Sequence, residues 1–124
     1  MRPWWMTLLA VVCLVTLVVS AGLDLFLPSH RAVEVWFGFE LTGWLATLTA
    51  PLHWAIFAIG AWALWTAQAW AATAAAGYIF YAALSHLVWS EASPNGRGWP
   101  IGLVQAVVIA SIGFLVLRAD AQKR

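Results

Sequence analysis

Apolar residues dominate four long segments of this chain, and short polar stretches separate most of them. The longest uncharged stretch, residues 41–90, contains no Asp, Glu, Lys or Arg over 50 positions. A helix needs roughly 20 apolar residues to cross a hydrocarbon core of about 30 Å, so this stretch has the length of two membrane crossings. Residues 66–70 are the one plausible break within it. They predict a short turn between two helices that pack antiparallel.

The same pattern predicts four transmembrane helices, at about residues 4–23, 41–66, 71–89 and 100–117. Pro100 suits the first turn of the fourth helix, and Pro51 is expected to bend the second helix. The predicted fold is an all-α integral membrane protein, an antiparallel four-helix bundle that forms a single transmembrane domain over residues 1–124. Residues 24–40 are predicted to form an extracytoplasmic loop or interfacial segment.

The first apolar segment has an alternative interpretation as a cleaved signal peptide. Arg2, the apolar run and the small residues at 19–21 resemble a charged start, an apolar core and a cleavage site. The run is longer than the roughly 7–15 residues of a signal core, and two tryptophans beside Arg2 are typical of an interfacial anchor. We therefore predict a retained helix, while cleavage of residues 1–21 stays open as the alternative.

Composition and charge narrow the class of protein further. Hydrophobic residues make up 64% of the chain and charged residues 9%, whereas soluble domains contain roughly 25% charged residues. Lys and Arg near helix ends favour the cytoplasmic side. Four of the six basic residues fall on one side of the predicted topology, namely Arg2, Arg118, Lys123 and Arg124. Both termini are therefore predicted to be cytoplasmic, in the inner membrane of a bacterium, and the lack of a basic run argues against nucleic acid as a partner.

The chain is rich in tryptophan, with ten such residues in 124. Indole rings favour the headgroup level of a membrane, which accounts for the tryptophans near the predicted helix ends. Trp54 differs because it lies near the middle of its predicted helix, where its N–H lacks water. We expect its side chain to bond to a neighbouring helix or to line a pocket, unless it faces lipid as part of an aromatic ridge.

Ionisable and polar side chains in or beside the predicted spans form the candidate site, since such groups are costly at membrane depth. His53 is the deepest, and it is expected to bond a carbonyl freed by Pro51, to hold a heme or pigment, or to carry a proton. Its depth differs too much from that of His86 for both to bind one iron, so a single-histidine heme or pigment site is the cofactor alternative left open. The candidate ligand-binding or proton-handling residues are Asp24, Glu40, His53, Trp54, His86, Glu91 and Gln105.

Glu40 stands where the uncharged stretch begins, and it either caps the second helix or handles a proton or cation. His30 and Glu34 lie four residues apart but provide only two ligands, so no metal site is predicted. The sequence contains no nucleotide-binding loop, zinc-protease motif, paired-cysteine motif or nucleophile elbow. No catalytic residue is therefore assigned.

Two families offer partial resemblances. In length and number of spans the chain resembles the small multidrug resistance transporters, although residues 4–23 lack the acid which those proteins carry in their first span. A different set of residues resembles the emopamil-binding, or EXPERA-type, proteins, which include sterol isomerases: Asp24 after the first span, Glu40 before residues 50–54, and Glu91 ending the third. This resemblance implies a pocket for a flat hydrophobic ligand, with the two glutamates handling a proton or pairing with a cation. The chain is shorter than those proteins, and its fourth span has Gln105 without their asparagine and tryptophan arrangement.

Small residues at four-residue spacing, such as Gly102, Ala106 and Ala110, are typical of close packing between membrane helices. The sequence thus favours a small polytopic membrane protein without catalysis of its own, either an accessory subunit of a membrane complex or a homo-oligomer. One alternative is a binder or isomerase of a hydrophobic lipid or sterol-like ligand. A second alternative is a transporter of protons, ions or small molecules.

Overall fold

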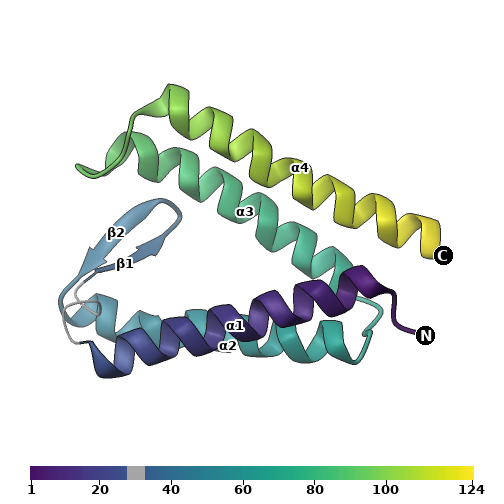
Figure 1. Ribbon diagram of the computed structural model, residues 1–124. Helices are drawn as coiled ribbons and strands as arrows, with labels where there is room; N and C mark the ends of the chain where they lie inside the picture. Colours follow the sequence, from purple (N-terminus) through teal and green to yellow (C-terminus); the bar gives the residue numbers. More distant parts are fainter. Residues whose placement is uncertain (28–32) are drawn as a thin grey trace. The chain divides into compact units, whose positions relative to one another are not determined.

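The four predicted helices are all present in the computed structural model, which describes residues 1–27 and 33–124 (Figure 1). They are α1 (Trp4–Phe26), α2 (Trp44–Trp65), α3 (Ala71–Ala92) and α4 (Trp99–Lys123). The shortest contain 22 residues, and a helix of that length rises about 33 Å, enough to cross a hydrocarbon core of about 30 Å. All four are long and apolar enough to span a membrane, which indicates a multi-pass membrane protein.

A two-stranded hairpin precedes α2, and most of it lies within residues 24–40, which the sequence predicted to form an extracytoplasmic loop or interfacial segment. Strand β1 (Val33–Trp36) pairs with β2 (Phe39–Thr42), and Phe37 and Gly38 form the turn with φ angles of 53° and 87°. Positive φ at both central residues is the geometry of a type I′ turn, whose twist matches that of paired strands. The predicted boundary at residue 41 is therefore wrong, since the strand continues beyond it and α2 begins only at Trp44.

The predicted break between the second and third helices is confirmed. α2 ends at Trp65, and Ala67 then adopts a φ of 52°. The Gln68 N–H donates to the Ala63 carbonyl at 2.9 Å, and the Ala67 N–H donates to the Leu64 carbonyl at 3.2 Å. These bonds match a Schellman motif, which ends a helix by satisfying its last carbonyls.

The chain divides into two compact units, and each is described by itself. Unit 1 contains residues 1–34 and 41–71, and unit 2 contains residues 35–40 and 72–124. In unit 1, α1 lies antiparallel along α2 (Figure 1). In unit 2, α3 and α4 lie antiparallel side by side, and Phe37 at the hairpin tip contacts α3 through Tyr81. The two units therefore each contain one pair of long apolar helices.

Small residues allow α3 and α4 to approach closely. Gly102 and Ala106 of α4 are buried, and a Cβ added at Gly102 would lie 2.6 Å from the Ser90 Cβ of α3. Further along, Gly113 faces the ring of Phe80, which a Cβ would approach to 2.8 Å. The predicted packing role of Gly102 and Ala106 is confirmed, since close backbone approach is a main source of helix association in lipid.

Candidate functional site

Asp24 and Trp54 join α1 to α2 within unit 1. The indole Nε1–H of Trp54 donates to Oδ2 of Asp24 at 2.8 Å, and Asp24 is only 6% exposed. Hydrogen bonds to a charged acceptor are roughly twice as strong as those between neutral groups. The Trp54 side chain thus bonds to a neighbouring helix, which is one of the three alternatives that the sequence left open. Asp24 provides the acceptor that a mid-helix indole lacks in an apolar environment.

Replacing Asp24 with alanine is expected to lower the free energy of unfolding by about 1–3 kcal/mol, because the N–H of Trp54 loses its acceptor. Asp24→Asn retains a carbonyl oxygen and should lose less. Titration of SDS into detergent micelles measures the unfolding free energy. Asp120→Ala is the control, since Asp120 pairs with Arg124 of the same helix at 3.0 Å, near the end of α4. Equal losses in the two alanine variants would contradict the role of Asp24.

His53 lies against a carboxylate from the hairpin. Its Nδ1 is 2.7 Å from Oε1 of Glu34, and the two side chains are 16% and 18% exposed. The sequence suggested Glu34 only as a partner of His30, which lies outside the described residues. The signal that was missed is the alternating pattern of residues 33–36, which is typical of a strand. This strand places Glu34 beside His53 of α2, 19 positions later in the sequence.

The Glu34–His53 contact orients the imidazole ring. A carboxylate bonded to one imidazole nitrogen fixes the tautomer and orientation of the ring. The contact also attaches β1 to α2. The described residues contain no group of three or more His, Cys, Asp or Glu side chains placed to hold a metal ion.

Glu40 lies in β2 and bonds to the end of α3 in unit 2. Its Oε1 accepts hydrogen bonds from Ser93 Oγ at 2.6 Å and from Trp89 Nε1 at 2.9 Å. These donors, Ser93 first, hold the pKa of the Glu40 carboxyl below its usual value, and desolvation opposes the shift. Glu40 does not cap α2, as one sequence interpretation proposed, because that helix follows Gly43 and has no side-chain cap.

The lowered pKa of Glu40 predicts that its contribution to stability depends on pH. A carboxyl whose pKa is lower in the folded state stabilises that state above its unfolded pKa of about 4.3, and this contribution is lost as the pH falls through the folded pKa. The unmodified protein should therefore lose more stability between about pH 6 and about pH 3 than Glu40→Gln, which cannot titrate. Thermal unfolding in detergent measures both proteins. The same pH dependence in both would contradict this assignment.

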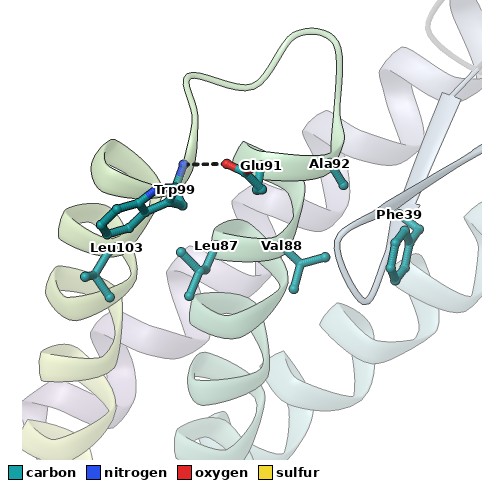
Figure 2. A pocket seen from close by; sticks show the side chains of 7 residues that line it. All are labelled: Phe39, Leu87, Val88, Glu91, Ala92, Trp99 and Leu103. Carbon is teal, nitrogen blue, oxygen red and sulfur yellow. Dashed lines mark hydrogen bonds between the residues drawn. The ribbon is translucent and has the colours of Figure 1, made fainter.

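Glu91 lies at the edge of an apolar groove in unit 2. Its Oε2 accepts a hydrogen bond from the Trp99 N–H at 2.8 Å, at the start of α4 (Figure 2). A carboxylate is favourable there because the first N–H groups of a helix carry partial positive charge. The groove has a volume of about 550 Å³ and is lined, besides these two residues, by Phe39, Leu87, Val88, Ala92 and Leu103. The sequence pointed to Glu91, but it did not reveal the apolar residues that gather around it from α3, α4 and β2.

His86 and Gln105 are brought together by the pairing of α3 with α4. Nε2 of His86 lies 2.6 Å from Oε1 of Gln105, so this ring nitrogen donates its proton to the amide oxygen. The imidazole also lies beside the indole of Trp89, with ring centroids 5.8 Å apart. Both histidines named for a heme or pigment site, His53 and His86, thus have a protein side chain at one ring nitrogen.

The predicted site residues fall into two sets, one in each unit. Unit 1 contains Asp24, His53 and Trp54, and unit 2 contains Glu40, His86, Glu91 and Gln105. Within these sets the structure joins two pairs, Asp24 with Trp54 and His86 with Gln105. Comparison with known proteins adds no assignment, since no protein-family model, no curated protein and no solved structure matches this chain.

Proposed function

We propose that this protein is a small multi-pass membrane protein without catalysis of its own, which acts as an accessory subunit of a membrane complex or as a homo-oligomer. One observation carries the proposal: all five acidic residues of the chain bond to other groups of the protein. Four of them, Asp24, Glu34, Glu40 and Glu91, attach one helix or strand to another. Acids with structural partners suit the holding of helices together better than chemistry on a substrate.

The proposed arrangement is a single antiparallel bundle of the four helices in the inner membrane of a bacterium. Both termini lie in the cytoplasm, because Lys and Arg near helix ends favour that side, and residues 24–40 lie at the opposite surface. Large apolar side chains such as Val18, Phe114 and Leu115 are 63%, 67% and 64% exposed. They supply faces for lipid and for neighbouring subunits.

Native mass spectrometry of the protein, extracted in mild detergent from its own host membranes, tests this function. We expect other subunits at a fixed stoichiometry, or a homo-oligomer of this chain. A monomer that carries one defined ligand other than a bilayer phospholipid, and that converts it to a product, would overturn the proposal.

A second candidate function is binding, or isomerisation, of a hydrophobic lipid or sterol-like ligand. The groove beside Glu91 favours it, because an apolar lining with one carboxylate at its edge matches a hydrophobic ligand that carries a single polar or cationic group.

Filling the groove tests this second candidate. Leu103 lines the groove and is 44% exposed, whereas Val107, one helical turn further along α4, is 58% exposed and does not line it. If the groove binds a fluorescent sterol, Leu103→Trp should abolish binding and Val107→Trp should preserve it. Equal binding in both variants would exclude this groove.

A further inference from the structure

A second groove lies between α1 and α2 in unit 1, in the half that contains the start of α1. It has a volume of about 280 Å³ and is lined by Ala10, Val11 and Leu14 from α1, and by Ala61, Trp62 and Trp65 from α2. The small side chains Ala10 and Ala61 leave space between the helices. The indoles of Trp62 and Trp65 are each 55% exposed and form a wall. The groove therefore has the shape and apolar lining to take a narrow hydrocarbon chain.

Arg2 lies at the end of this groove that is formed by Trp65. Its guanidinium carbon lies 3.9 Å from the ring centroid of Trp65, one of the groove's lining residues. Nε donates to Thr7 Oγ1 at 2.8 Å, and Nη1 donates to the Trp65 carbonyl. Among the residues that the structure describes, Nη2 has no hydrogen-bond partner. Arg2 is thus fixed in position while part of its guanidinium stays open to an anion.

The length of α1 from its start to the groove matches the thickness of one leaflet of a bilayer. From Trp4, at the start of α1, to Leu14 in the groove, the helix rises about 15 Å, which is half of the roughly 30 Å hydrocarbon core. Tryptophans at the start of α1 and the end of α2 are typical of the headgroup level. The groove consequently extends from the headgroup level toward the middle of the membrane. The guanidinium of Arg2 lies at its headgroup end.

We propose that this groove binds one acyl chain of an anionic phospholipid, and that Arg2 holds the phosphate of that lipid. The planar guanidinium matches the oxygens of a phosphate, and basic pockets between membrane helices bind anionic headgroups. A lipid at this position would fill the space between α1 and α2. This site goes beyond the proposed function, since it requires neither a partner protein nor catalysis.

The first test measures lipid retention by native mass spectrometry, after loading the full chain with equal amounts of phosphatidylglycerol and phosphatidylcholine. We expect one retained lipid per chain and about a fivefold preference for phosphatidylglycerol, as the attraction of one basic residue near a membrane surface implies. Arg2→Gln should remove the preference. Arg118→Gln, which changes an exposed basic residue of α4, should preserve it.

The second test separates the groove from general attraction between charges. Ala61→Leu fills the groove and should lower retention of both lipids at least fivefold, whereas Ala58→Leu changes an exposed residue outside it and should not. Soluble glycerol phosphate in excess should not displace the bound lipid. Equal retention of the two lipids by the unmodified protein, equal losses in Arg2→Gln and Arg118→Gln, or unchanged retention in Ala61→Leu would overturn the proposal. None of these results would bear on the subunit composition that tests the proposed function.

Discussion

Replacing Gly38 with alanine is expected to detach the hairpin tip from α3 and to lower the free energy of unfolding by about 2–4 kcal/mol. Gly38 has a φ of 87°, a conformation that residues with a Cβ adopt only at a cost in energy. An added Cβ would also collide with the Val88 side chain and lie 2.6 Å from the Ser85 carbonyl. The hydrogen bond from the Phe37 N–H to the Tyr81 hydroxyl, 3.0 Å long, depends on this close approach.

Gly43→Ala is the matched control for the hairpin. Gly43 also has a positive φ, 63°, but no described atom lies within 4 Å of a Cβ added there. Gly43→Ala should therefore introduce the backbone strain without the collision, and it should lose less stability than Gly38→Ala. Unfolding in SDS measures both variants, and hydrogen exchange of residues 33–42 reports whether the hairpin detaches. Equal losses of stability, with the hairpin still protected in Gly38→Ala, would contradict this prediction.

Replacing Gly102 with leucine is expected to separate α3 from α4 and to cost about 3 kcal/mol or more. Even a single Cβ at this position would lie 2.6 Å from Ser90 Cβ and 2.9 Å from Ser90 Oγ, so a leucine has no space. The helices would have to move apart, which would also strain the His86–Gln105 bond one turn away. Close contact supplies much of the association between helices in lipid, so the loss should be large.

Gly77→Leu makes the same change of volume at an exposed position of α3. Among the described residues, nothing lies within 4 Å of a Cβ added at Gly77. Leucine also has a higher helix propensity than glycine, so this variant should be neutral or slightly stabilising. SDS titration of both variants gives the comparison. A loss in Gly77→Leu as large as that in Gly102→Leu would show that volume alone, and not the α3–α4 contact, causes the effect.

Individual residues show how far the sequence could predict the site. For Trp54, the position in the sequence showed that an indole donor far from water needs an acceptor. It left open whether the side chain bonds to another helix, lines a pocket or faces lipid. That the acceptor is Asp24, 30 positions earlier, depends on how α1 lies along α2. No local pattern contains that information.

The hairpin shows why part of the fold was missed. Residues 33–42 alternate partly as strands do, but the turn Phe37-Gly38 lacks the Asn-Gly or Asp-Gly pair typical of a type I′ turn. The positive φ of Phe37 is supported by tertiary contacts, since its ring meets that of Tyr81 edge-on at 5.2 Å and its N–H bonds to the Tyr81 hydroxyl. The acid that follows, Glu40, consequently bonds to α3 instead of capping α2.

The approximate positions of the four long helices, and their apolar character, could be predicted from the amino-acid sequence. An apolar segment in lipid must satisfy its backbone hydrogen bonds internally, and a helix satisfies them within the segment itself. A long apolar run therefore predicts a helix. The partners of the polar side chains and the residues that line the two grooves could be identified only from the folded chain. The bonds of Glu34, Asp24 and Glu40 to other elements join residues that are between 19 and 53 positions apart in the sequence. Residues so far apart come together only when whole helices and strands pack against one another.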